Sequence, residues 1–184
     1  MTKESSNSSR KIVIMGLNNA GKSSIALNLR GKKNLLSHLS LGPTEDHQII
    51  NTEILDTKFN ILDLGGQETY RTKHLKNLSK YLENCDKLIY VIDIQDKSRY
   101  ELSLDYLKKI MDQVSSSDHA INLSIFFHKY DPNIEEKNPE IQDKANVLLE
   151  KIKGIIPSGI SFQVFKTTIY TIFEKNPMIL TLQG

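Results

Sequence analysis

The chain has 184 residues, of which 39% are hydrophobic and 25% charged, and its net charge is +2. This length and composition are typical of one globular domain with a core of its own. Because the net charge is small and no basic stripe with interleaved aromatic residues occurs, we do not expect a nucleic acid as partner. The single cysteine, Cys85, excludes a disulfide framework and indicates a reducing compartment.

The first and last residues carry no signal for a membrane anchor. Residues 1–10 are polar and rich in Ser and Asn, and we expect them to form a disordered tail. Thr2 stands where a myristoylated protein needs glycine, and Leu182, Gln183 and Gly184 offer no cysteine for prenylation. No apolar run approaches the ~18 residues that span a bilayer. We therefore expect a cytoplasmic protein without an intrinsic membrane anchor.

The first motif is the run Gly16–Ser23, GLNNAGKS, which has the phosphate-loop spacing G-x-x-x-x-G-K-[ST]. It follows the apolar run Lys11–Met15, typical of a buried strand, and precedes Ser24–Arg30, which allows a short helix. In this context backbone N–H groups and the helix N-terminus bind a phosphate, whereas a chance match in a turn would lack these flanks. Lys22 would reach the β- and γ-phosphates, and the Ser23 hydroxyl would hold Mg²⁺. The predicted phosphate-binding residues are Asn18, Asn19, Ala20, Gly21, Lys22, Ser23 and Ser24.

The rest of the chain alternates strands with helices. Residues 31–43 have the Gly and Pro content of a loop, Ile49–Leu55 and Lys58–Leu62 predict a hairpin, and the polar stretch to Glu83 predicts a helix. Further elements are expected as strands at Leu88–Ile92, Ile121–Phe127 and Ile160–Phe165, and as helices at Tyr100–Val114, Asp143–Ile152 and near Ile169. This order predicts an α/β fold with a mostly parallel six-stranded sheet, helices on both faces and a ligand at the carboxyl ends of the strands.

A second motif, Asp63–Gln67, follows the apolar end of the hairpin. A carboxylate at Asp63 could hold Mg²⁺ opposite the Ser23 hydroxyl, although Asp-x-Gly more often forms a plain turn. Gly66 could bring its N–H to a γ-phosphate, and Gln67 could orient the attacking water. Thr44 is a weaker candidate for Mg²⁺, because a loop threonine is usually a solvated turn residue. We predict Lys22, Gly66 and Gln67 as catalytic residues and Ser23, Thr44 and Asp63 as metal ligands.

A third motif, His128-Lys129-Tyr130-Asp131, closes a predicted strand. Asp131 could accept hydrogen bonds from N1–H and N2–H₂ of guanine, while the stem of Lys129 covers the purine. Adenine has an acceptor at N1, so it would leave Asp131 unpaired. The alternative is a surface turn. After the last strand, the backbone N–H groups of Thr168 and Ile169 could reach guanine O6.

In this order and spacing, the motifs resemble a small GTPase of the Ras superfamily over roughly residues 10 to 175. The segments Gly16–Ser23 and Asp63–Gln67 are similar to the Arf group. The segments His128–Asp131 and Lys166–Tyr170 are similar to the Rag/Gtr group, in which a histidine also replaces the asparagine usual in the superfamily. The chain is thus identified as an Arf/Rag-like GTPase.

The resemblance implies a P-loop NTPase G domain over residues 11–176 that binds GTP or GDP with Mg²⁺ and hydrolyses GTP slowly. Two loops, around Thr44 and after Asp63, would order on the γ-phosphate and relax after hydrolysis. Effectors, an exchange factor and an activating protein would bind through Thr44 and the Asp63–Lys80 segment, and a homodimer or heterodimer is compatible with the resemblance.

Further expectations concern the C-terminal residues and a basic segment. Pro177 should end the last helix early, so residues 177–184 are expected to form a tail. One group of basic residues is expected to form a solvated face or, alternatively, a partner surface that moves with the nucleotide. These residues are Arg71, Lys73, His74, Lys76 and Lys80. No arginine stands in an evident position for an arginine finger, so fast turnover is expected to need a partner.

Two functions stay open at this point. The first is a GTP-hydrolysing switch, which the presence of Gln67 favours. The second is a non-hydrolysing, nucleotide-bound adaptor in a Rag-like heteromeric complex. An ATP-using enzyme is disfavoured by Asp131.

Overall fold

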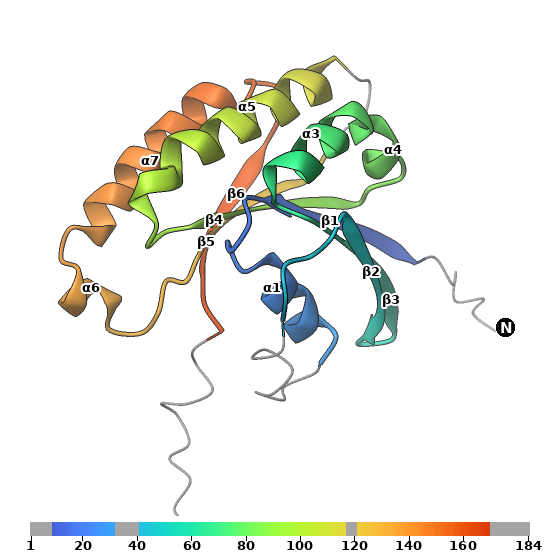
Figure 1. The fold of residues 1–184 in the computed structure, drawn as a ribbon, viewed down its shortest axis with the longest axis horizontal. Helices are drawn as coiled ribbons and strands as arrows, with labels where there is room; N and C mark the ends of the chain where they lie inside the picture. Colours follow the sequence, from blue (N-terminus) through green and yellow to red (C-terminus); the bar gives the residue numbers. More distant parts are fainter. Residues whose placement is uncertain (1–8, 32–40, 117–120, 170–184) are drawn as a thin grey trace, which may run out of the picture.

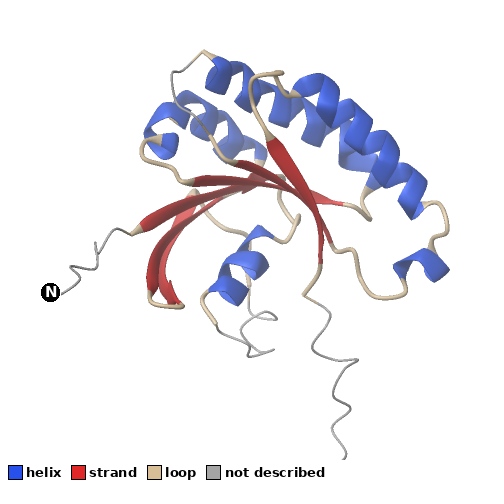
Figure 2. Ribbon diagram, turned by 180° about the vertical axis from the view of Figure 1, so that it is seen from behind, coloured by secondary structure: helices blue, strands red, loops and turns tan. Residues whose placement is uncertain are grey.

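The computed structural model describes residues 9–31, 41–116 and 121–169 as a six-stranded sheet in the order β2-β3-β1-β4-β5-β6. The parallel strands are β1 (Arg10–Gly16), β3 (Thr57–Leu64), β4 (Lys87–Asp93), β5 (Leu123–His128) and β6 (Phe162–Thr167). The edge strand β2 (His47–Ile54) runs antiparallel to β3. Figure 2 shows the twist of this sheet, and the predicted mostly parallel sheet is confirmed.

Helices cover both faces of the sheet (Figure 1). On one face lies α1 (Lys22–Leu29), and on the other lie α3 (Glu68–Lys76), α4 (Leu78–Leu82), α5 (Tyr100–Ser115) and α7 (Ile141–Ile155). Successive side chains of β1 point to opposite faces of the sheet and so pack against different helices. Val13 and Met15 pack into the core under α5 and α7, and Ile14 packs into a smaller core under α1. The strands of the centre are therefore apolar on both faces.

The predicted hairpin is present, but its turn lies one residue earlier than the runs Ile49–Leu55 and Lys58–Leu62 indicate, because β2 ends at Ile54 and β3 begins at Thr57. Its turn consists of Leu55 and Asp56, whose φ angles are +47° and +59°. Two successive left-handed residues match the twist of a two-residue hairpin turn. Leu55 is 93% exposed, so the turn places an apolar side chain in solvent.

Several boundaries differ from the sequence-based prediction. The polar stretch to Glu83 is two helices, because the chain leaves helical geometry at Asn77, whose side chain donates to the Lys73 carbonyl. Strand β5 begins at Leu123 rather than Ile121. A 3₁₀ turn, η1 (Lys97–Arg99), and a short helix, α6 (Ile134–Lys137), were not predicted.

Some predictions lie outside the described residues. These are most of the N-terminal tail, the loop over 32–40, the helix after Ile169 and the tail over 177–184. The domain boundaries accordingly stay predictions. In the described part of the chain, no helix has the length and hydropathy needed to cross a bilayer.

Candidate functional site

The predicted motifs meet at the carboxyl edge of the sheet. An open cleft of about 540 Å³ lies there, and the loops after β1 and β3, the segment before β2 and the residue after β5 line it. Its lining residues are Asn18, Asn19, Gly21, Lys22, Ser23, Ser24, Leu41, Gly42, Pro43, Thr44, Gly66, Gln67 and Lys129. The residues of the predicted motifs thus lie together at the sheet edge where the sequence predicts a ligand.

Two glycines shape the loop between β1 and α1. Gly16 has a φ of +144°, and a Cβ there would lie 2.3 Å from the carbonyl oxygen of Val91 on β4. Gly21 has a φ of +92°, and a Cβ there would lie 2.3 Å from the ring of His128 on β5. Neither position accepts a side chain without movement of its neighbour. The loop is thereby held close to the ends of β4 and β5.

Lys22 begins α1 and is buried, with 5% of its surface exposed. Its ammonium group donates to the Leu17 carbonyl at 2.8 Å. Burial lowers the pKa of Lys22 to about 8, while the negative charge of Asp63 raises it and the charges of Arg71 and Arg99 lower it further. The buried cation is bound to a carbonyl that a phosphate oxygen could replace as acceptor.

Ser23, Thr44 and Asp63 come together, as the sequence predicts for metal ligands. The Ser23 hydroxyl donates to Asp63 Oδ2 at 2.5 Å and lies 2.8 Å from Thr44 Oγ1, which donates to the same Oδ2 at 3.2 Å. Asp63 is fully buried, and its Oδ1 has no hydrogen-bond partner among the described residues. Burial raises the pKa of its carboxyl group, and the bond from Ser23 opposes this shift.

This donor set fits a magnesium ion. Mg²⁺ prefers oxygen ligands, and hydroxyl and carboxylate oxygens meet here at one point. The unpaired Oδ1 of Asp63 is a buried acceptor that a cation or its bound water would satisfy. The role of these residues as metal ligands stays a prediction that the geometry supports.

Gly66 packs directly on the phosphate loop. Its carbonyl oxygen accepts the Asn18 N–H at 3.0 Å and Arg71 Nη1 at 3.1 Å. A Cβ at Gly66 would lie 2.2 Å from the Asn18 nitrogen, so the contact requires glycine. Gln67 precedes α3, lines the cleft and is half-buried. The catalytic roles predicted for Gly66 and Gln67 remain untested.

His128 lies behind the phosphate loop. Its side chain is 2% exposed, its ring faces Gly21, and its Nδ1 is 2.9 Å from the Thr167 hydroxyl at the end of β6. Burial lowers the pKa of His128 to about 4, with a further decrease from the charge of Lys129. The imidazole is therefore neutral at physiological pH and ties the loop to the ends of β5 and β6.

Lys129 and Asp131 are held by Asp93 and Gln95, which were not predicted, and Asp131 also by Thr168, which was predicted for its backbone N–H group. Lys129 pairs with Asp93 on β4 at 2.7 Å. The Gln95 amide donates to Asp131 Oδ2 at 2.9 Å and to the Lys129 carbonyl at 2.7 Å, and the Thr168 hydroxyl donates to Asp131 Oδ1 at 2.7 Å. Ile169 follows as the last described residue. Gln95 could have been found from its place three residues after the apolar run Leu88–Ile92, at the carboxyl end of a strand.

The prediction of a solvated basic face is wrong for His74. This side chain is fully buried between Tyr70 and Tyr81, and its Nε2 lies 3.4 Å from Asp46 Oδ1. Burial lowers the pKa of His74, against the opposing effect of Asp46. Lys73 is exposed but pairs with the same carboxylate at 2.8 Å. The segment before β2 is thereby bound to α3.

A phosphate loop between β1 and α1, an acidic group at the end of β3 and a Lys-x-Asp segment after β5 define the class of P-loop GTPases. Residues 11–175 match the model of the Gtr1/RagA G protein conserved region, and the chain belongs to this family. The predicted Arf/Rag-like resemblance is confirmed, and the chain is a small GTP-binding protein.

Similar proteins come from the Arf-like group. The chain is 30% identical over 138 residues to ADP-ribosylation factor-like protein 3 of Caenorhabditis elegans, covering 74% of this chain and 70% of that protein. It is 28% identical over 120 residues to ADP-ribosylation factor-like protein 6 of the same organism, covering 65% and 60%.

Solved structures share the fold. The Arl6 BBS3 small GTPase of Trypanosoma brucei, with the bound nucleotide analogue GppNp, has a TM-score of 0.65 at 19% identity, covering 88% of this chain and 87% of its own. The mammalian SRP receptor has a TM-score of 0.65 at 13% identity, covering 86% and 91%.

Proposed function

We propose that this protein binds GTP or GDP together with Mg²⁺, hydrolyses GTP slowly and changes conformation with the nucleotide to recruit partners. The observation that carries the proposal is the convergence of Ser23 and Thr44, which line the cleft, on the buried Asp63, whose Oδ1 is unpaired among the described residues. Family membership supports the guanine nucleotide as ligand.

Each residue has a defined task in this proposal. Ser23, Thr44 and Asp63 hold the metal ion, which supplies neutralising charge to the phosphates. Lys22 exchanges its bond to the Leu17 carbonyl for a bond to a phosphate oxygen, and Gln67, which lines the cleft, orients the attacking water. Hydrolysis is slow because these residues position groups but supply little further charge to the transition state.

Asp131 selects the base in this proposal. Its carboxylate accepts from Gln95 and Thr168, and each oxygen has a second lone pair for the donors of guanine. Adenine would place an acceptor against this carboxylate, which is a costly mismatch.

The segments that would recruit effectors, an exchange factor and an activating protein are the loop around Thr44 and residues Asp63–Lys80. They are physically joined, because the Asp46 carbonyl accepts the Gly65 N–H at 2.6 Å and the Asp46 carboxylate pairs with Lys73. A change at the phosphate would therefore reach both segments. We place this activity in the cytoplasm, in keeping with the lone, unpaired Cys85.

Phosphate release from GTP and from ATP, with Mg²⁺ and with EDTA, tests the proposal. We expect release from GTP only, dependent on Mg²⁺. The variant Gln67→Leu should lose at least about tenfold in rate with binding retained. Gln113→Leu, an exposed position on α5, is the matched control. Preferential use of ATP would refute the guanine assignment, and tight GTP binding without release would favour the adaptor function.

A further inference from the structure

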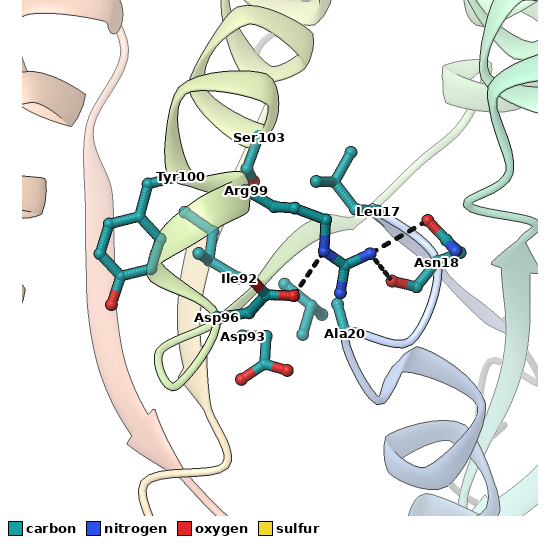
Figure 3. Close-up of a pocket in the computed structure, with 10 residues that line it drawn as sticks. Leu17, Asn18, Ala20, Ile92, Asp93, Asp96, Arg99, Tyr100 and Ser103 are labelled. Carbon is teal, nitrogen blue, oxygen red and sulfur yellow. Dashed lines mark hydrogen bonds and ion pairs between the residues drawn. The ribbon is translucent and has the colours of Figure 1, made fainter.

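Arg99 points toward Asn18 of the phosphate loop and lines a small cavity together with Leu17 and Ala20 (Figure 3). Its Nη1 donates to the Asn18 carbonyl at 3.0 Å and to Asn18 Oδ1 at 3.2 Å. Arg99 belongs to η1, the turn that follows β4, and lies 81 residues from Asn18 in the sequence. The contact thus joins two segments that only the fold brings together.

Arg99 is itself fixed. Its Nε donates to Asp96 Oδ2 at 2.5 Å, and the Ser98 hydroxyl donates to Asp96 Oδ1 at 2.6 Å. A guanidinium group is a planar fork, so one edge can bind Asp96 while a second nitrogen binds Asn18. The 3₁₀ turn therefore presents the arginine in one orientation.

The bond to the Asn18 carbonyl also fixes the next peptide group. In a trans peptide the C=O and the following N–H point in opposite directions. The Asn18 carbonyl points at Arg99, so the Asn19 N–H points away from it. Asn19 lines the cleft, whereas Leu17 and Ala20 line the small cavity beside Arg99. Asn18 is held on its other side as well, because its N–H donates to Gly66.

The Asn19 N–H has no acceptor among the described residues. Asn19 has a φ of +60°, a left-handed conformation that asparagine adopts more readily than most residues. Arg99 binds the carbonyl of the preceding peptide group, that of Asn18, and adds a positive charge behind this peptide. A donor held in this way needs no reorganisation when an anion arrives.

We propose that Arg99 is a positioning residue that directs the Asn19 N–H toward a phosphate of the bound nucleotide. This inference rests on the proposed nucleotide site. Arg99 does not line the cleft and acts through the Asn18–Asn19 peptide. It is distinct from an arginine finger, which would contact the transferred phosphate itself.

The test compares Arg99→Gln with the control Lys97→Gln, which removes the same charge from an exposed position in the same turn. For Arg99→Gln we expect the single-turnover rate of GTP hydrolysis to fall about tenfold or more. The ³¹P resonances of a bound non-hydrolysable GTP analogue should also shift. Lys97→Gln should match the wild type in both measurements.

Two further variants keep the inference testable if Arg99→Gln does not fold. Arg99→Lys keeps the charge but loses the fork, and Asp96→Asn releases the guanidinium from its second partner. Each should move the same ³¹P resonances in the same direction, by less. A wild-type spectrum and rate in all folded Arg99 variants, together with a lowered melting temperature, would overturn the proposal and assign Arg99 a structural role only.

The two proposals fail in different ways. If the wild type binds GDP but releases no phosphate from GTP, the proposed hydrolysis fails, and the ³¹P spectra of bound GDP still test Arg99. If the wild type hydrolyses GTP and Arg99→Gln matches it in rate and spectrum, the role of Arg99 fails and the GTPase assignment stands.

Discussion

The contact between Gly21 and His128 can be tested by adding one methyl group. A left-handed conformation costs an alanine roughly 1–2 kcal/mol, and insertion of a methyl group into a packed site costs roughly 1–3 kcal/mol. The Cβ of Gly21→Ala would lie 2.3 Å from the buried His128 ring, so both costs apply. We expect the free energy of unfolding to fall by about 2–5 kcal/mol in urea titrations.

Gly31→Ala separates the two contributions. Gly31 has a φ of +78°, but a Cβ there meets no atom within 4 Å, so only the backbone cost of about 1–2 kcal/mol applies. The double variant Gly21→Ala/His128→Ala should be less destabilised than the sum of the single variants, because the methyl group then has room. Equal losses for Gly21→Ala and Gly31→Ala, or strict additivity in the double variant, would refute the reasoning.

Three further predictions concern the base-binding side of the site. Burial lowers the pKa of His128 to about 4, so as the pH falls this imidazole takes up a proton in the unfolded chain before it does so in the folded protein. The free energy of unfolding should therefore decrease as the pH falls from about 6.5 toward 4, by roughly 2 kcal/mol between pH 7 and pH 5. Urea titrations of His128→Asn at these two pH values should lack this contribution to the pH dependence. Gln95→Leu should weaken binding of a fluorescent GTP analogue about tenfold relative to Gln113→Leu, because Asp131 and the Lys129 carbonyl lose their common donor. Asp131→Ala should reduce the preference for GTP over ATP at least about hundredfold in competition assays, and an unchanged preference would contradict the role of Asp131.

The phosphate loop and the order of the elements could be predicted from the sequence because both depend on short-range spacing. Gly16, Gly21 and Lys22 are fixed by one motif, and a continuous apolar run such as Leu88–Ile92 identifies a central strand from its residue types. The sheet edge that carries the site followed from this alternation.

The features that could not be predicted from the sequence depend on tertiary contacts. His74 lies in a polar helical stretch, yet it is buried and contacts Asp46, Tyr70 and Tyr81, two of which come from other elements of the fold. Arg99 has the local appearance of a solvated residue in a charged turn, and its contact with Asn18 needs η1 to lie beside the phosphate loop. The residue types alone do not show that these two segments lie next to each other.

The bonds of Asp46 have a kinetic consequence. Its main chain accepts the Gly65 N–H and its carboxylate binds Lys73 and faces His74, so the segment that carries Thr44 and the helix after Gln67 share one anchor. When one of the two segments rearranges, either the bonds of Asp46 break or the other segment moves with it. Fluorescent probes placed separately on the two segments should accordingly report a single common relaxation time when the nucleotide changes.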